Sequence, residues 1–395
     1  MNYGFRSTFD MHYDLPGNWR VSGITGMETQ AENAIVAGYK MVADSSHPEG
    51  YNIIGPMKSN QSVFANTSSY FTEWTLSMPH DLSITAGVGL TTLYLRLNNR
   101  LYQAGNTAPT SYAQNYNNMV APHLAINKVF DNKYSLYFSY TQAYRPPVSG
   151  DILITATGEL NTGLKPETGS QWEIGTKGNI LGNSLHYELA AFYTRFSNKM
   201  TSVAVPLNAG TTAYTYTANG GDQSDKGLEL YLSWDAYQAA TGFFRTVHPF
   251  ANLCYSDYKY SGLQFGKLDK NKEPEVADYN GKAVAGVAPL TANAGVDLQM
   301  QWGLYANASF NHRDGMPITS NNEYNTSAYN LLNAKLGIRR MVCKHFNVNV
   351  FAGANNITGT QYYYMVFLNQ LPDAYLPAPD KINYYGGIEL TYDIR

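Results

Sequence analysis

The sequence is short of charge, of cysteine and of long apolar runs, and each shortage excludes a class of protein. Charged residues make up 14% of the 395 residues, against roughly 25% in a typical soluble protein. The formal net charge is −3, and no basic stripe or binding motif is present, so nucleic acid is not an expected partner. Cys254 and Cys343 form neither a disulfide framework nor a CxxC pair, and we expect two isolated thiols.

The sequence contains no run of about 18 apolar residues, which excludes a transmembrane helix. The mean hydropathy of −0.33 still permits a membrane protein, because a barrel strand shows only every second residue to lipid. Residues 1–15 lack the charged and apolar regions of a signal peptide. An exported protein needs one, so we expect a leader that was removed or that lies upstream of Met1.

Catalytic motifs are missing as well. The sequence has no nucleophile elbow, no P-loop and no HExxH motif. Its eight histidines are scattered, and none has a second ligand at metal-binding spacing. We therefore expect a protein that is not an enzyme and that uses no cofactor or metal of its own.

The sequence is instead rich in aromatic and small polar residues, and it alternates. Aromatic residues make up 14%, and 33 of them are tyrosines. A lipid-facing band with aromatic girdles around a polar lumen requires this mixture. Apolar and polar residues alternate with a period of two, as in a strand with one apolar face, over residues 82–91, 185–194, 228–235, 347–354 and 388–395. Soluble sandwich strands usually have about five or six residues, so longer segments favour strands that cross a bilayer.

The connections between these segments alternate in length. Short turns are expected at residues 16–18, 80–81, 131–133, 181–183, 237–242, 302–303 and 343–345. Long connections are expected near residues 30–62, 96–117, 146–166, 207–220, 259–283, 314–325 and 359–381, although 207–220 itself has a strand-like pattern. Short periplasmic turns and long extracellular loops are typical of outer-membrane barrels. The pattern predicts an all-β, antiparallel transmembrane barrel of about fifteen strands, an odd number where complete single-chain barrels are even. We therefore expect an incomplete barrel.

A run of motifs between about residues 130 and 395 resembles the TonB-dependent outer-membrane receptors. The first is Leu-Lys-Pro-Glu at residues 164–167, which opens a strand with Glu-Ile-Gly-x-Lys at residues 173–177. Four other segments resemble family motifs: residues 134–147 lie before this strand, and residues 225–235, 286–299 and 352–363 lie after it. All five motifs occur in the order that the family has. Residues 1–130 fit the family's middle strands by pattern alone.

The resemblance implies a 22-stranded barrel with a plug in its lumen. It implies that residues 1–395 are the C-terminal part of the barrel domain, with the plug and first strands absent. It also implies energy-coupled uptake of an iron-siderophore complex across the bacterial outer membrane. The expected partners are the ferric siderophore or a similar chelate, outer-membrane lipid, and a TonB-type energy-coupling protein that acts through the missing plug.

Other functions stay open at this point. Haem, cobalamin or another chelate could be the ligand of such a receptor. A passive porin of 14 or 16 strands is a further alternative, although its usual charged constriction is disfavoured by the low charge content. The last alternative is a soluble β-rich binding protein such as a lectin or adhesin.

Five residues are candidate ligand contacts. Tyr112 and Tyr116 could stack on a flat chelate, and their structural alternative is the outer aromatic girdle. Arg145 precedes Pro146-Pro147, and His312-Arg313 lie at the mouth of a strand. For Arg145 the favoured alternative is a structural role where a strand meets a loop, and for His312-Arg313 it is a solvated lumen or rim pair. The residues 165–167 are expected to set extended geometry at the start of a strand, because proline fixes its own φ and restricts its predecessor.

Overall fold

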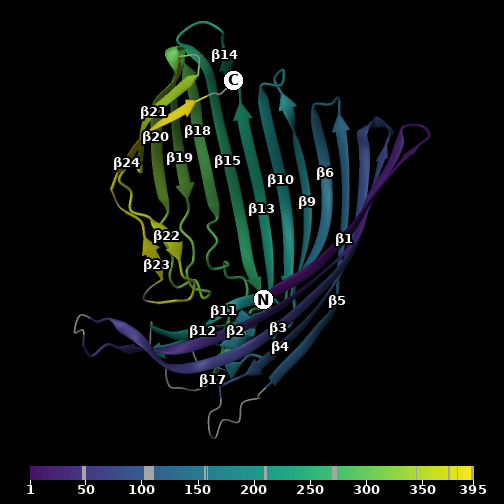
Figure 1. Ribbon diagram of the computed structural model, residues 1–395, viewed down its shortest axis with the longest axis vertical. Coiled ribbons are helices and arrows are strands. Elements are labelled where there is room, and N and C mark those ends of the chain that lie inside the picture. The colour runs from purple at the N-terminus through teal and green to yellow at the C-terminus, as the bar shows by residue number, and fades with distance from the viewer. Residues whose placement is uncertain are drawn as a thin grey trace.

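The computed structural model describes the chain except for residues 47–49, 102–110, 155–156, 158, 209–210, 269–273, 344, 372–373, 380 and 393–395. One large antiparallel sheet dominates it (Figure 1). Its strands pair in the order β1 (Asn2–Leu15), β2 (Trp19–Ala43), β3 (Asn52–Met78), β4 (Leu82–Asn99), β5 (Ser111–Phe130), β6 (Tyr134–Arg145), β9 (Glu167–Ile180), β10 (Leu185–Ser197), β13 (Asp222–Trp234), β15 (Phe244–Ser261), β18 (Leu290–Met300), β19 (Leu304–Arg313), β20 (Tyr329–Cys343), β21 (Phe346–Asn355) and β24 (Asn383–Tyr392).

The remaining elements are small and lie beside this path. The short strand β14 (Tyr237–Gln238) pairs with β15. Four two-stranded sheets pair β7 (Leu153–Ile154) with β8 (Glu159–Leu160), β11 (Met200–Asn208) with β12 (Thr211–Asn219), β16 (Gln264–Leu268) with β17 (Pro274–Asp278), and β22 (Tyr363–Val366) with β23 (Tyr375–Pro377). The helices are short: η1 (Pro79–Asp81), α1 (Ser149–Ile152) and η2 (Gln301–Gly303). No helix among the described residues is long and apolar enough to cross a membrane.

The prediction of about fifteen antiparallel strands is confirmed, but two predicted loops are wrong. Strands β2 and β3 pair from Arg20–Ser77 to Ala43–Asn52, so most of residues 30–62 is strand rather than loop. Strands β4 and β5 likewise replace the outer parts of the loop expected at 96–117. In these strand extensions apolar residues are adjacent, as at residues 34–37 and 53–54, and so are polar residues, as at residues 59–62 and 98–99. The extensions therefore lack the strict apolar–polar alternation by which sequence reveals a strand. The strand-like pattern at 207–220 belongs to the β11–β12 hairpin.

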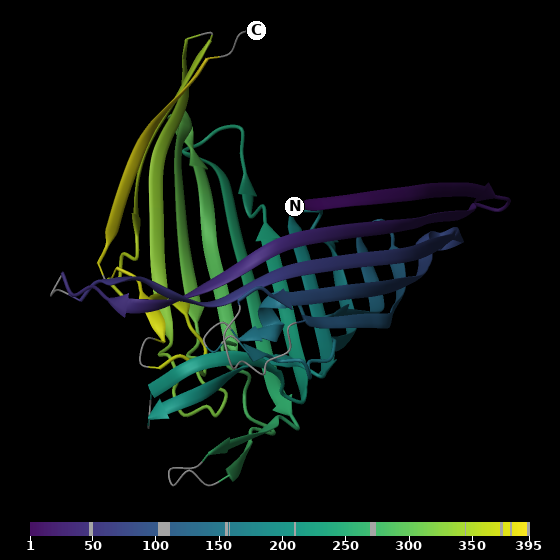
Figure 2. The same ribbon diagram turned by 60° about the horizontal axis from the view of Figure 1, so that its bottom comes forward.

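The sheet curves into an open trough. Strands β6 to β21 form its wall, and β1 to β5 run obliquely across its open side (Figures 1 and 2). In the part of the chain that the structure describes, β1 pairs only with β2 and β24 only with β21, so the sheet has two free edges. A sheet edge in hydrocarbon leaves backbone donors and acceptors unpaired, at several kcal/mol each. The trough is therefore an incomplete barrel, as the strand count predicted.

The tight connections and the long ones lie at opposite ends of the wall, which we call the turn end and the loop end. At the turn end the backbone takes left-handed geometry, for example at Asn18 (φ 63°) and Asn132 (φ 54°). Asparagine tolerates this region better than most residues. The predicted strand end at residues 393–395 and Lys344 of the last predicted turn lie outside the described residues.

The two faces of the wall differ in chemistry. Hydrogen-bonded register connects Leu136, Thr176, Leu189, Leu230, Leu253 and Ala292 in one row on the convex face. Near the loop end this face carries a ladder of rings, with Trp172 5.3 Å from Tyr140 and 5.7 Å from Tyr193. Near the turn end Phe130 stacks on Tyr134 at 5.2 Å. Apolar rows between two aromatic bands are what a lipid-facing surface requires.

Candidate functional site

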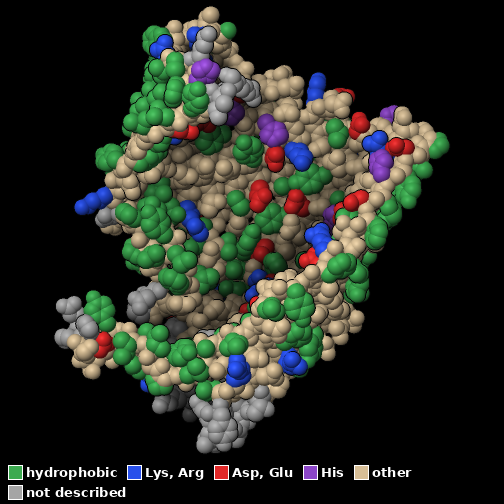
Figure 3. All heavy atoms as spheres, viewed as in Figure 1, with side chains coloured by type: hydrophobic (Ala, Val, Ile, Leu, Met, Phe, Trp, Pro, Cys, Tyr) green, Lys and Arg blue, Asp and Glu red, His purple; other side chains and the backbone are tan. Residues whose placement is uncertain are grey.

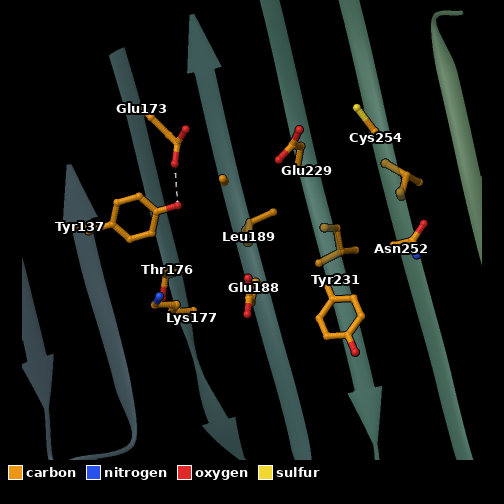
Figure 4. A pocket seen from close by; sticks show the side chains of 13 residues that line it. Tyr137, Glu173, Thr176, Lys177, Glu188, Leu189, Glu229, Tyr231, Asn252 and Cys254 are labelled. Atoms are coloured by element: carbon orange, nitrogen blue, oxygen red, sulfur yellow. Dashed lines mark hydrogen bonds between the residues drawn. The ribbon is translucent and has the colours of Figure 1, made fainter. Parts of the chain in front are cut away.

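The concave face of the trough carries an acidic wall on its central strands. Glu173, Glu188 and Glu229 come from β9, β10 and β13 and line a hollow of about 310 Å³ (Figure 4). Figure 3 shows acidic side chains gathered in this hollow. Alternation places them there, because each glutamate is one residue away from a lipid-facing position such as Ile174, Leu189 or Leu230.

Hydrogen bonds orient the carboxylate of Glu173 within this wall. The hydroxyl of Tyr137 donates to Oε1 of Glu173 at 2.8 Å, and Nε2 of Gln171 donates to Oε2 at 3.0 Å. Tyr137 leans over Gly175, where an added Cβ would lie 2.5 Å from the ring. Glycine at this position therefore makes room for the ring, and the tyrosine holds the glutamate. The acidic wall was not singled out from sequence, although alternation placed Glu188 and Glu229 on the polar faces of their strands.

A second group of charges on the concave face lies on β20. Lys335 sits 4.1 Å above the ring of Phe351, and the guanidinium of Arg339 lies 5.6 Å from the ring of Tyr305. No carboxylate in the described ranges lies within ion-pair distance of either cation. Aromatic faces stabilise these cations in place of anions, by about 0.5–2 kcal/mol for each contact. The concave face thus carries acid on β9 to β13 and base on β20.

Three of the predicted ligand residues, Tyr112, Tyr116 and Arg145, lie at the loop end and contact other parts of the chain there. The side chain of Tyr116 is 5% exposed, its hydroxyl lies 3.4 Å from the hydroxyl of Tyr112, and it donates to the backbone oxygen of Leu164. Tyr112 packs against the buried cluster of Val63, Leu95, Leu97, Ile152 and Leu164. These positions support packing for both tyrosines.

Arg145 belongs to a network of buried carboxylates. Its Nη2 donates to Asp151 at 3.2 Å, and its Nη1 lies 3.8 Å from Glu167. Glu167 also accepts from Nζ of Lys199 at 2.7 Å and from the backbone N–H of Met200 at 3.1 Å. This network joins the end of β6, the start of β9 and the β11–β12 hairpin. These contacts therefore support a structural role for Arg145 and for residues 165–167, where strands meet loops.

His312 and Arg313 face opposite sides of β19. His312 pairs in register with Ala292, in the lipid-facing row of Leu253, and its ring bonds to Asn330 at 2.7 Å and Asp314 at 3.1 Å. Arg313 pairs with Thr291 and Tyr329, in the concave row that runs through Cys254, Glu229, Ala190 and Gly175 to Tyr137. The two residues predicted as one pair are thus separated by the wall.

Four tyrosines surround the loop end of β19 and β20. Tyr329 lies 5.5 Å from both Tyr362 and Tyr363, and Tyr362 lies 5.7 Å from Tyr364. Burial, and then a hydrogen bond with Tyr364, raises the pKa of Tyr362. Residues 362–364 are adjacent in the sequence, and the fold joins them to Tyr329 and to Arg313. We call Arg313 and these four tyrosines the aromatic mouth.

Metal binding has no support from side-chain clusters. Among the described residues, no three His, Cys, Asp or Glu side chains come together as a metal site requires. Cys254 is a half-buried free thiol on the concave face, and Cys343 is an exposed free thiol at the turn end.

The chain matches known proteins over most of its length. Residues 1–357 match the family model described as TonB dependent receptor-like, beta-barrel. Two Pseudomonas putida proteins, the ferric-pyoverdine 358 receptor and the ferric-pyoverdine BN7/BN8 receptor, are each 28% identical to it, over 184 and 174 residues. These alignments cover 45% and 43% of this chain, and 21% and 19% of the relatives.

Solved structures extend the likeness to the whole sheet. The ferric citrate transporter FecA aligns with a TM-score of 0.73 at 15% identity, over 98% of this chain and 54% of that one. The siderophore receptor PiuA from Acinetobacter baumannii aligns at 0.72 and 16% identity, over 98% of this chain and 56% of that one. The chain thus spans a little over half of these receptors and shares the fold of that part. With its open, two-faced antiparallel wall and a family match over residues 1–357, the chain belongs to the TonB-dependent receptor-like β-barrel family.

Proposed function

We propose that this chain forms the wall and ligand-facing loops of an outer-membrane receptor for energy-coupled uptake of a ferric siderophore. The observation that carries the proposal is the layer of interlocked loops over the loop end of a charged trough. Asn369 donates to the backbone oxygen of Ser202 at 2.9 Å, and Nζ of Lys282 donates to that of Asn321 at 2.8 Å. Loops from distant parts of the sequence are thereby held together at one opening, as a selective receptor requires.

The convex face supports a position in the outer membrane. Its apolar rows lie between the aromatic ladder and the aromatic residues of the turn end, which fit the two lipid–water interfaces. In this proposal the loop end faces the outside and the turn end the periplasm.

Energy coupling requires a gate, and the concave charges suggest what the gate contacts. Glu229 has no hydrogen-bond or ion-pair partner among the described side chains, and neither Lys335 nor Arg339 has a carboxylate partner there. Charges that face a filled lumen need partners of opposite sign. We therefore propose that residues 1–395 are the C-terminal part of the barrel domain, and that a plug with complementary charges fills the trough. A TonB-type protein would act on that plug.

Uptake of radioactive iron tests the proposal. Cells that express the native gene, and cells in which it is deleted, are given a panel of ferric siderophores under iron limitation. We expect uptake of at least one siderophore to depend on the gene and to stop when a protonophore collapses the proton gradient. Gene-dependent uptake that survives the protonophore, together with steady single-channel conductance, would instead identify a porin.

A receptor for another chelate is the second candidate. The solved structures of similar fold include a copper transporter, OprC, and the hemophore receptor HasR in complex with hemophore and heme. The same assay with haem, cobalamin and copper chelates separates this candidate, because a gene-dependent signal with one of these and none with any ferric siderophore would replace the proposed ligand.

A further inference from the structure

The aromatic mouth contains a cation with no anion. Arg313 is half-buried at the loop end of β19, its Nη2 lies 3.3 Å from Sδ of Met316, and its guanidinium lies 5.9 Å from the ring of Tyr363. Its Nε is buried and has no hydrogen-bond partner in the part of the chain that the structure describes. No described carboxylate lies within ion-pair distance, since Asp314 turns to His312 on the other face.

Such an arginine is unusual for a purely structural residue. Buried polar groups are almost always hydrogen-bonded, and a guanidinium removed from water usually has an anionic partner. Arg145 shows the structural case in the same protein, with Asp151 and Glu167 beside it. Arg313 has instead a sulfur atom and a ring, which hold the side chain in place and leave its charge unmatched.

The rings beside Arg313 are supported from behind. The hydroxyl of Tyr363 lies 3.1 Å from Oγ1 of Thr326, and that oxygen accepts from the backbone N–H of Met316 at 3.0 Å. Tyr363 meets Tyr329 edge to face, with an interplanar angle of 89°. The aromatic mouth is therefore a preorganised surface of ring faces and edges around one planar cation, and the ring of Tyr364 at its margin is exposed.

We infer that the aromatic mouth binds an anionic ferric chelate through a planar pair of anionic oxygens, held by Arg313 and stacked on the neighbouring tyrosines. This inference rests on the proposed function and adds the charge class of the ligand. Guanidinium presents paired donors that fit a carboxylate or a catecholate in a bidentate manner. Tyrosine rings add contact area at low cost in side-chain entropy. A neutral trihydroxamate chelate offers no such anionic pair.

Binding by the receptor in outer membranes of cells that express the native gene tests this assignment. The probes are ferric citrate and a ferric tris-catecholate, both anionic, and a neutral ferric trihydroxamate, with dissociation constants measured by fluorescence quenching. Arg313→Gln removes the charge, and Arg313→Lys keeps it without the planar fork. His312→Gln is the matched control, because His312 is adjacent in sequence but faces the other side of the wall.

We expect Arg313→Gln to weaken binding of an anionic chelate by about tenfold or more, as loss of a charged hydrogen bond does. Arg313→Lys should have a smaller effect, and His312→Gln almost none. Heat-modifiable gel mobility shows that each variant is folded. Equal loss for anionic and neutral chelates, no loss for Arg313→Gln, or binding of the neutral chelate alone would each overturn the assignment. If the unaltered receptor binds no ferric chelate of any kind, the proposed function itself fails.

Discussion

Leu189 and Ala190 are neighbours in the sequence but lie on opposite faces of the wall. Leu189 pairs with Leu230 in the convex row, whereas Ala190 pairs with Glu229 in the concave row. This relationship makes the two-faced architecture testable with one substitution at each position. An arginine at a lipid-facing position near the bilayer midplane costs about 2–4 kcal/mol, and one in the lumen does not.

We predict that Leu189→Arg destabilises the protein by about 2–4 kcal/mol for this reason. Ala190→Arg should cost little, because its guanidinium would point toward the carboxylates of Glu188 and Glu229. The measurement is the free energy of unfolding in guanidinium from phospholipid bilayers. Equal destabilisation at the two positions would contradict the assignment of faces.

The aromatic ladder on the convex face gives a second prediction. Trp172 contacts both Tyr140 and Tyr193, so Trp172→Ala removes two ring pairs at once. Each pair contributes about 0.5–1.5 kcal/mol beyond the area it buries, so we expect a loss of at least about 1–3 kcal/mol. Trp172→Phe is the control that keeps an aromatic ring and should retain most of this stability in the same bilayer experiment. A Phe variant as unstable as the Ala variant would count against the ladder.

The Glu167 network predicts how the β11–β12 hairpin is held. The side chain of Glu167 is 5% exposed, so Lys199→Met leaves a buried carboxylate with one partner fewer. Breaking a buried pair in this way costs about 3–5 kcal/mol. We expect faster cleavage of the hairpin by an added protease, with the barrel itself still resistant. Lys226→Met, a change at an exposed lysine with no ion pair among the described residues, is the control and should leave cleavage unchanged.

The turn between β9 and β10 contains a strained leucine. Leu181 has φ 52° and is 64% exposed, so its side chain contributes little packing to offset its left-handed backbone. Asparagine tolerates this conformation better, and we expect Leu181→Asn to stabilise the protein by about 0.5–1 kcal/mol. Asn183, with φ 71°, should respond in the opposite sense to Asn183→Val. Unfolding midpoints in guanidinium compare the two, and a loss of stability in Leu181→Asn would refute the strain argument.

The sequence by itself determined the wall. Alternation along residues 185–194 and 228–235 set which side chains face lipid, because a strand turns every second residue the same way. The same rule with the turn residues gave the approximate strand count, and ordered motifs such as residues 164–167 gave the family. The strand extensions within residues 30–62 and 96–117 were not found from sequence, since adjacent apolar residues or adjacent polar residues in them break the period of two.

The tertiary structure alone decided the site. Tyr137 on β6 and Arg313 on β19 lie in one concave row that crosses seven strands, and nothing local to either residue records that row. Strand register likewise places His312 and Arg313 on opposite faces. Register and loop packing together bring Arg313 beside Tyr329 and Tyr363, and bring Arg145 beside Glu167. Register is set by pairing across the whole sheet, whereas sequence periodicity reports only one strand at a time.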